Sequence, residues 1–303
     1  MASDLITSEV LERCEAISAP FRVSCGETFR LKDVDPGGTL DLAGDKRGAK
    51  AALEQGVQML SELQQKLYAQ NSWGVLLLFQ AMDAAGKDGT IKHVMSGVNP
   101  QGCQVTSFKA PSAVELDHDY LWRVNQCLPE RGRIGIFNRS YYEETLVVRV
   151  HPELLDRQSL PPSLRTPGIW QQRFEEIRHY EAYLSANGFL VRKFFLHLSK
   201  AEQKRRFLER LNNPRKHWKF SAADIRERAH WDHYMQAYEE MIRATATEQA
   251  PWYVVPADHK WFSRLVVAAA VIQSLHGLDL HYPQISDEAL RALAVAREQL
   301  QAE

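Results

Sequence analysis

The feature that most constrains the fold is a short apolar run followed by a loop of small residues and a Gly-Lys pair. Residues 75–79 read VLLLF, and residues 80–90 read QAMDAAGKDGT. Small residues let backbone N–H groups close around an anion, and the N-terminus of a helix adds partial positive charge. A buried strand, such a loop and a helix opened by Gly-Lys are typical of a phosphate-binding loop. The predicted phosphate-binding residues are Ala84, Ala85, Gly86, Lys87, Asp88 and Gly89.

The loop departs from the usual phosphate-binding pattern at two positions. Ala81 stands where the first glycine is usual, and Asp88 stands where a Ser or Thr usually follows the lysine. An ordinary strand-to-helix turn is therefore an alternative interpretation. Features elsewhere in the chain have to decide between the two.

Four further short apolar segments read as buried strands of a parallel sheet: residues 105–108, 133–137, 190–196 and 252–255. Segments with helical spacing of apolar residues precede, separate and follow the strands: residues 45–69, 87–96, 113–126, 170–187, 199–212, 221–246 and 259–276. Strands that alternate with helices indicate a parallel sheet covered on both faces. The sequence predicts one α/β domain with a five-stranded parallel sheet.

The ends of the chain differ from this alternating pattern. Residues 1–45 lack sustained periodicity and include a turn-prone Pro-Gly-Gly at 36–38, so we expect an N-terminal arm that packs on the domain. Residues 46–280 are expected to form the domain itself. Residues 281–303 are expected to hold a C-terminal helix, because residues 286–301 are amphipathic.

Charge and cysteine content narrow the possible functions. The 303 residues carry 37 basic and 38 acidic side chains, a formal net charge of -1, so the chain lacks an overall basic field for nucleic acid. No stretch approaches the roughly 20 apolar residues of a membrane span, and the acidic start is unlike a secretory signal. The four cysteines form no CxxC pair. We expect a cytoplasmic protein with reduced thiols and with no nucleic-acid or membrane partner.

A second group of polar residues follows the predicted strand at 133–137. The chain continues as NRSYYEE through residues 138–144. In phosphate-loop enzymes the end of a neighbouring strand faces the transferred phosphoryl group, where Arg139 would neutralise charge. A surface arginine that pairs with Glu143 is the alternative.

Basic residues gather in residues 203–219, which hold seven cations and one acid, Glu209. The cations are Lys204, Arg205, Arg206, Arg210, Arg215, Lys216 and Lys219. A solvated helix face normally mixes charges of both signs, and such a face is the alternative here. We interpret residues around 200–222 as a basic lid over a polyanion.

Several longer motifs together resemble polyphosphate kinase family 2, with its class III branch as the nearest match. They read AMDAAGKDGTIKHV, GVNPQG, FKAPS, HDYLWR, FNRSYYEE, RVHPE, NPRKHWKFS and APWYVVPADHKW. The resemblance runs from about Phe29 to Leu275. It implies a three-layer α/β/α P-loop kinase fold of the thymidylate-kinase type, with a helical lid.

The resemblance also implies the chemistry. Members transfer phosphoryl groups reversibly between inorganic polyphosphate and nucleotides with Mg²⁺, for which Mn²⁺ is a candidate substitute. Class III members phosphorylate AMP to ADP and ADP to ATP, and guanine nucleotides are further candidate acceptors. A homo-oligomer is expected.

Position by position, the resemblance assigns roles to individual residues. The catalytic set is Asp83, Lys87, Arg139, Arg206 and Arg210. Further polyphosphate contacts are expected at Lys92, Lys109 and Lys216, and Mg²⁺ is expected at Asp83, with Asn138, Glu143 and Glu144 as additional candidates. Two departures stand out: Ala81 replaces a glycine, and Asn138 replaces the aspartate of other branches.

Two other functions fit parts of the pattern. One is an ATP-donor nucleoside monophosphate kinase, and the other is a protein that binds polyanions without turnover. The long basic segment suits a polymer substrate, and an intact Asp83 and Lys87 favour an enzyme. We interpret the aromatic residues Trp122, Trp218, Trp231 and Trp261 as packing residues rather than base-stacking platforms.

Overall fold

Six strands form one sheet in the order β1-β6-β5-β2-β4-β3 in the computed structural model, which describes residues 8–44 and 46–303. The remaining residues of the predicted arm, 1–7 and 45, lie outside the described residues. The strands are β1 (Arg22–Val23), β2 (Gly74–Gln80), β3 (Cys103–Ser107), β4 (Ile134–Asn138), β5 (Phe189–His197) and β6 (Trp252–Pro256). All neighbours pair in parallel except β1, which is antiparallel to β6.

The predicted α/β class and its five parallel strands are confirmed, but the sheet also contains a sixth, antiparallel strand that was not predicted. The additional strand, β1, has only two residues, and neither is buried. A segment this short shows no periodicity from which a strand could be predicted. It adds a short antiparallel edge beside β6, while the five predicted strands make up the parallel part.

The centre of the sheet is β2, which lies between β4 and β5. Leu77 faces Ile136 on one side and Arg192 on the other. Every residue of β2 is buried, as expected for a parallel strand with helices on both faces. Because the parallel strands all end at the same edge, the segments that follow β2, β3, β4 and β5 meet there.

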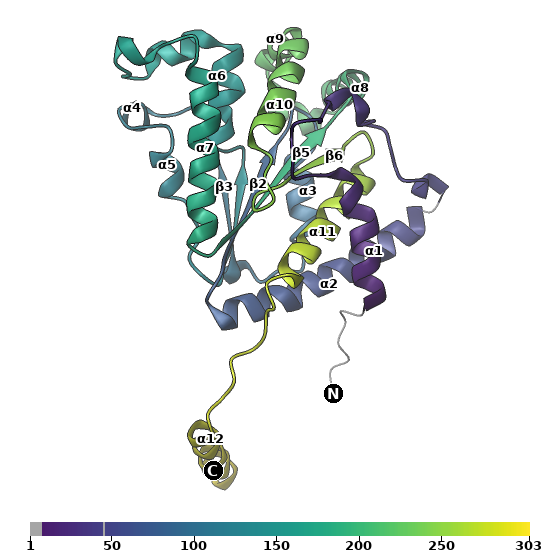
Figure 1. The fold of residues 1–303 in the computed structure, drawn as a ribbon. Helices are drawn as coiled ribbons and strands as arrows, with labels where there is room; N and C mark the ends of the chain where they lie inside the picture. Colours follow the sequence, from purple (N-terminus) through teal and green to yellow (C-terminus); the bar gives the residue numbers. More distant parts are fainter. Residues whose placement is uncertain (1–7, 45) are drawn as a thin grey trace.

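Helices cover both faces of the sheet (Figure 1). On one face lie α1 (Ser8–Ser18), α2 (Lys46–Gln70), α3 (Lys87–Val94) and α11 (Lys260–His276). On the other lie α5 (Trp122–Asn125), α6 (Val147–Val150), α7 (Ile169–Ala186) and α10 (Trp231–Thr245). Two separate apolar clusters fill the spaces between sheet and helices, so the molecule has three layers.

Short 3-10 helices occupy many of the connections. They are η1 (Ala19–Phe21), η2 (Leu31–Asp33), η3 (Leu42–Gly44), η4 (Pro100–Gly102), η5 (Tyr141–Thr145), η6 (Pro152–Arg157), η7 (Pro162–Leu164) and η8 (Pro214–Lys219). Of these, η5 follows β4 directly and holds the two tyrosines and two glutamates of the FNRSYYEE motif.

A buried ion pair ties β5 to the layer that contains η5. The Nζ of Lys193 lies 2.6 Å from a carboxylate oxygen of Glu181 on α7, and both side chains are inaccessible to solvent or nearly so. Lys193 also donates to the hydroxyl of Tyr142 and to the carbonyl of Thr245. All of these partners satisfy a charge that would otherwise be costly to bury.

Two predicted helices are interrupted. Residues 113–126 form α4 (Ala113–Leu116) and α5, because the Asp119 side chain accepts a hydrogen bond from the N–H of Leu121 and starts a turn. Residues 221–246 form α9 (Ala222–Ala229) and α10, which meet at His230. The second break separates an α9 without buried residues from an α10 that begins at the buried Trp231.

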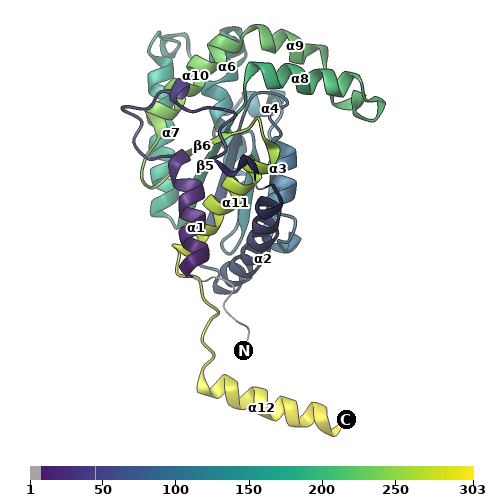
Figure 2. The ribbon, with the colours of Figure 1, turned by 90° about the vertical axis from the view of Figure 1, so that its right-hand side faces the viewer.

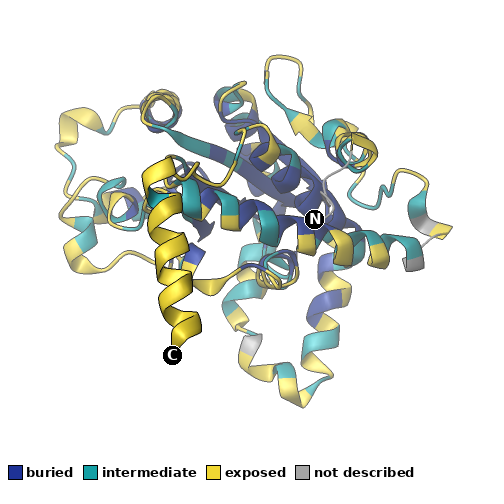
Figure 3. Ribbon diagram, turned by 90° about the horizontal axis from the view of Figure 1, so that it is seen from below, coloured by how far each residue is buried: buried dark blue, intermediate teal, exposed yellow. Residues whose placement is uncertain are grey.

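The predicted lid, residues around 200–222, contains α8 (Lys200–Leu211) and η8 and ends at the start of α9, which we include in the lid. These elements project past the carboxyl edge of the sheet, at the end of the molecule opposite to α12 (Asp287–Ala302) (Figure 2). No residue of α12 is buried (Figure 3), and it stands apart from the layers, as Figures 1 and 2 show. Within the described chain, no helix combines the length and the apolar character required to cross a bilayer.

Candidate active site

The loop between β2 and α3 has the backbone geometry of an anion site. Helix α3 begins at Lys87, directly after Gly86, whose φ is 104°. Ala84 also has a positive φ, 66°, and the N–H of Ala85 donates to the carbonyl of Met82. Since the positive φ angles of this described loop fall on Ala84 and Gly86, Ala81 needs none of the conformational freedom of glycine.

Lys87 lies half-buried at the start of α3. Its Nζ donates to the carbonyl of Ala81 at 2.9 Å, so the side chain folds back over the loop. Burial lowers the pKa of Lys87, Arg139 lowers it further, and the carboxylates of Asp83, Glu143 and Asp88 oppose the decrease. The ammonium therefore sits in an environment in which an added anion would be stabilising.

Arg139 joins the segment after β4 to the loop after β2. Its N–H donates to the carbonyl of Phe79, and its guanidinium lies 3.2 Å from Asp83 and 3.3 Å from Glu143. The nearby Glu143 carboxylate is the main cause that raises the pKa of Arg139. The predicted alternative of a pair with Glu143 is thus present, but Arg139 also lies against the loop.

A cavity of about 590 Å³ opens above this loop, and we call it the phosphate-loop cavity. It brings together most of the predicted residues: Asp83, Ala84, Ala85, Gly86, Lys87, Asp88, Gly89, Lys109, Asn138, Arg139 and Arg210. These come from the loops after β2, β3 and β4 and from the lid helix α8. Ligands of open α/β sheets bind at this edge, outside the carboxyl ends of the strands.

The sequence analysis missed two lining residues of the phosphate-loop cavity that belong to the lid. Asp224 lies on α9, 3.8 Å from Arg210, and burial raises its pKa, with a further contribution from Asp83. Trp218 in η8 is 78% exposed and lines the cavity, so its interpretation as a packing residue is wrong. The buried Trp231 fits that interpretation. In the sequence, the one signal that could have distinguished the cavity-lining Trp218 from the buried Trp231 is that Trp218 lies within the basic segment.

Several predicted residues do not line the phosphate-loop cavity. Lys92 is exposed on α3, and Lys216 forms an ion pair with Glu209. Arg206 is 4% exposed and lies behind the loop, where it contacts backbone carbonyls. The structure thus gives the two lid arginines different surroundings: Arg206 is buried behind the loop, whereas Arg210, one helical turn further along α8, lines the cavity.

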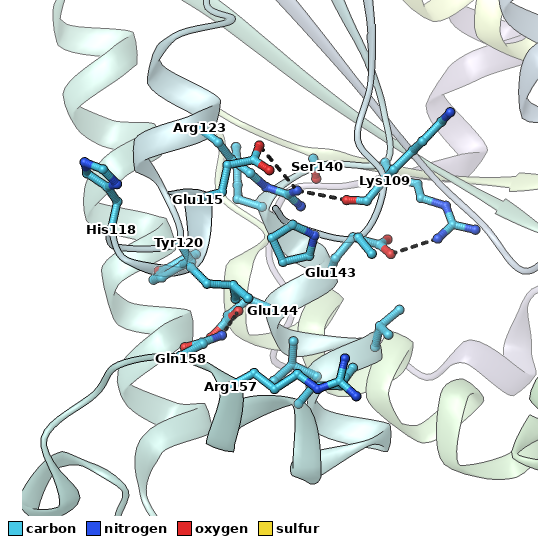
Figure 4. A pocket seen from close by; sticks show the side chains of 18 residues that line it. Lys109, Glu115, His118, Tyr120, Arg123, Ser140, Glu143, Glu144, Arg157 and Gln158 are labelled. Carbon is cyan, nitrogen blue, oxygen red and sulfur yellow. Dashed lines mark hydrogen bonds and ion pairs between the residues drawn. The ribbon is translucent and has the colours of Figure 1, made fainter. Parts of the chain in front are cut away.

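A second cavity, of about 220 Å³, adjoins the first, and we call it the side pocket (Figure 4). Both cavities are lined by Lys109, Ala110 and Arg139. On one wall Arg123 donates to the carbonyl of Lys109 at 2.8 Å and lies 3.8 Å from Glu115.

The opposite wall of the side pocket comes from η5, α6 and η6. It includes both glutamates that were metal candidates, Glu143 and Glu144. Glu144 accepts two hydrogen bonds from Gln158 and lies 3.3 Å from Arg173, and burial raises its pKa. Both glutamates line the side pocket and not the phosphate-loop cavity, where Asp83 and Asp88 lie, so we assign neither to the metal.

The donor set of the phosphate-loop cavity fits a magnesium ion held mainly by substrate. In the described residues no three His, Cys, Asp or Glu side chains gather into a site of their own. Mg²⁺ commonly uses one or two carboxylates together with water and substrate phosphates. Asp83 and Asp88 supply two carboxylates to one cavity. Asn138 donates to Asp88 at 2.7 Å, which leaves its amide oxygen as a further donor to a metal.

Comparisons with known proteins agree with this geometry. The family described as Polyphosphate kinase 2 (PPK2) matches residues 43–282. A protein of Rhodopseudomonas palustris named ADP-polyphosphate phosphotransferase is 54% identical over 92% of this chain and 97% of its own length. The AMP/ADP-polyphosphate phosphotransferase of Meiothermus ruber is 46% identical over 87% of this chain and 95% of its own length.

Comparison with solved structures agrees with the family match. The crystal structure of Polyphosphate Kinase 2 from Arthrobacter aurescens TC1 superposes with a TM-score of 0.83 at 41% sequence identity. The superposition covers 91% of this chain and 95% of that one. The α12 helix lies beyond the residues that the family matches.

Proposed function

The chain belongs to the polyphosphate kinase 2 family, and we propose that it transfers the terminal phosphoryl group of inorganic polyphosphate to both AMP and ADP, reversibly and with Mg²⁺. It is a phosphotransferase that phosphorylates nucleotides at the expense of polyphosphate. The names of its relatives cover ADP in one case and both AMP and ADP in the other. The use of AMP by this chain is therefore the part of the proposal that most needs a test.

The observation that carries the proposal is the pair of adjoining cavities. The phosphate-loop cavity is lined by the cations Lys87, Arg139 and Arg210, and it suits a polyanion. The side pocket is lined by polar and apolar groups and suits a nucleoside. Arg139 lines both cavities, so a phosphate of a nucleotide in the side pocket would meet the end of the polymer there.

The reaction needs positioning and charge neutralisation more than covalent catalysis. A phosphate oxygen of the nucleotide attacks the terminal phosphorus of the polymer, and the bond to the bridging oxygen of the shortened polymer breaks. Lys87 and the backbone N–H groups of the loop hold the phosphates. Arg139 and Arg210 offset the negative charge of the phosphoryl group during transfer. Asp83 orients Arg139 through their 3.2 Å contact.

The metal belongs to the proposal as well. Asp83, Asp88 and Asn138 would hold Mg²⁺, or Mn²⁺ in its place, and the metal would neutralise charge on the phosphate oxygens. Since Asp83 contacts Arg139, and Asp88 and Asn138 contact each other, the site is arranged before substrate arrives.

Cytoplasmic location and a homo-oligomer complete the proposal. The four cysteines, Cys14, Cys25, Cys103 and Cys127, are free thiols, which supports a reducing compartment. The homo-oligomer is proposed from the resemblance to the family. Light scattering of the purified protein over a range of concentrations measures the oligomeric state directly.

A single set of reactions tests the activity. The purified protein is incubated with long-chain polyphosphate, Mg²⁺ and AMP, ADP, GMP or GDP in turn, and the products are separated by chromatography. We expect AMP to yield ADP and then ATP, and ADP to yield ATP. Unreacted AMP beside phosphorylated ADP would limit the proposal to diphosphates. Conversion of AMP by ATP but not by polyphosphate would identify an ordinary monophosphate kinase.

A further inference from the structure

The side chains of α8 contact three successive carbonyl groups of the phosphate-binding loop. Gln203 donates to the carbonyl of Asp83 at 3.0 Å. Arg206 donates through one guanidinium nitrogen to the carbonyls of Ala84 and Ala85, at 3.0 and 2.8 Å. The inner face of α8 therefore holds the back of the loop.

Arg206 has protein acceptors on each of its nitrogen atoms. Its second terminal nitrogen donates to the carbonyls of Ala257 and Asp258, which follow β6, at 2.6 and 3.0 Å. Its Nε donates to Glu202 at 2.7 Å. With all three nitrogens engaged and the side chain 4% exposed, no part of the guanidinium is directed at a phosphate.

These contacts determine where the N–H groups of the loop point. In a planar trans peptide the C=O and the following N–H point in opposite directions. Because the carbonyls of Asp83 and Ala85 face α8, the N–H groups of Ala84 and Gly86 face away from it. Ala84 and Gly86 both line the phosphate-loop cavity. The contacts also hold Ala84 at a φ of 66°, a conformation that an alanine rarely adopts.

From this geometry we infer that Arg206, together with Gln203, is a positioning residue for the proposed phosphoryl transfer rather than a phosphate ligand. It fixes the loop so that its N–H groups meet the phosphates. It also sets the position of Arg210, which lies one turn further along α8 and lines the cavity. The loop and the base of the lid thus form one preorganised unit. The inference rests on the proposed function where it predicts a change in kcat, whereas the predicted change in polyphosphate binding does not depend on turnover.

The experiment compares Arg206→Lys with Arg131→Lys. Lysine keeps the charge, but one nitrogen cannot reach both pairs of carbonyls. Arg131 is a matched control, since it also joins two backbone segments, through the carbonyls of Ser72 and Asn187, at the opposite edge of the sheet. Gln203→Met is a second variant that keeps the inference testable if Arg206→Lys does not fold.

The readouts are kcat and KM for both substrates, and the Kd for long-chain polyphosphate by calorimetry, at low and high salt. We expect kcat of Arg206→Lys to fall roughly 100-fold with little change in the KM for nucleotide, because a misplaced catalytic group costs about this much. The Kd should rise by a similar factor at both salt concentrations, because no exposed charge is removed. Gln203→Met should show a smaller loss of the same kind, and Arg131→Lys should keep the wild-type kcat.

Three results would overturn the inference. The first is a kcat and a Kd of Arg206→Lys, or of Gln203→Met if only that variant folds, within twofold of the wild type. The second is a Kd for polyphosphate that rises in Arg206→Lys while kcat stays within twofold of the wild type, which identifies a phosphate ligand rather than a positioning residue. The third is an equal loss of kcat in Arg131→Lys. A wild type that does not turn over polyphosphate would instead refute the proposed function, and the binding measurements would still decide the inference.

Discussion

At the scale of single residues, the site stores backbone strain at two non-glycine positions. Ala84 has a φ of 66° and Arg139 a φ of 65°. Such conformations cost of order 1–3 kcal/mol each and persist only where the surroundings impose them. The carbonyl of Ala84 is held by Arg206, and the N–H of Arg139 by the carbonyl of Phe79. Strain at both walls of one cavity is consistent with a site shaped before its ligand binds.

The variants Lys87→Ala and Asp83→Asn should each lose most phosphoryl transfer while they remain folded. Lys87 supplies a full positive charge at the loop, and Asp83 supplies a carboxylate that contacts Arg139. Loss of one such electrostatic group should lower kcat on the order of 100-fold or more. Steady-state assays with polyphosphate and ADP measure the loss, and circular dichroism reports whether the fold is retained. Turnover close to the wild-type value in either variant would exclude that residue from the mechanism.

His197 should make the protein less stable in mild acid. It ends β5 and is 8% exposed, and burial lowers its pKa to about 4. An unfolded chain protonates this ring near pH 6.5, whereas the folded chain does not until about pH 4. Its stabilising contribution is thus complete above pH 6.5 and is lost as the pH falls towards 4. Between pH 7 and pH 5 the loss amounts to about 2 kcal/mol.

Urea unfolding at the two pH values tests this contribution. The free energy of unfolding of His197→Gln should depend less on pH than that of the wild type, by about 2 kcal/mol over this interval. The exposed His281 offers a control, and His281→Gln should keep the wild-type pH dependence. An unchanged pH dependence in His197→Gln would contradict the assignment.

The sequence predicts which residues reach the site where they follow a strand, but not where their position depends on the direction of a side chain on a helix. Asp83, Lys87 and Arg139 could be identified, because each follows a strand at the carboxyl edge of the sheet. The separate positions of Arg206 and Arg210 could not. They are four residues apart on one helix and share a charge, and only the packing of α8 against the loop buries the first.

At the scale of elements, apolar runs predicted the five parallel strands, while the helix breaks escaped prediction. The spacing of apolar residues continues across His230, although the chain there passes from the lid helix α9 into the buried α10. Local spacing indicates which residues are apolar but not which layer they join. Tertiary contacts made by Trp231 and its neighbours supply that information.

The lid helix α8 leads to a prediction that depends on salt. Arg210→Ala should lower transfer from long-chain polyphosphate, because Arg210 lines the phosphate-loop cavity with part of its side chain in solvent. Salt screens such partly exposed charges over a Debye length of roughly 8–10 Å at physiological ionic strength. The loss should therefore shrink as salt rises. Arg297 on the exposed α12 is the control, and Arg297→Ala should behave as the wild type at every salt concentration. An Arg210→Ala enzyme with unchanged kinetic constants at low salt would remove this arginine from polymer binding.

At the scale of the whole molecule, the domain and α12 are almost independent. No residue of α12 is buried, and the segment before it touches the domain through a hydrogen bond from Tyr282 to Gln65. Deletion of residues 283–303 should thus leave the midpoint of thermal unfolding within about 2 °C of the wild type, because little apolar surface leaves water in this region on folding. Calorimetry and the polyphosphate assay measure the two effects. A markedly lower midpoint would reveal contacts of α12 with other copies of the chain.

The position of α12 also has a practical consequence. It carries the C-terminus away from the end of the molecule at which α8 and α9 stand (Figure 2). A polymer many times longer than the cavity must approach that end from open solution. Attachment of the protein to a bead or to a second enzyme through its C-terminus would therefore turn the phosphate-loop cavity outward, so that an immobilised nucleotide-regenerating catalyst would keep access to its longest substrate.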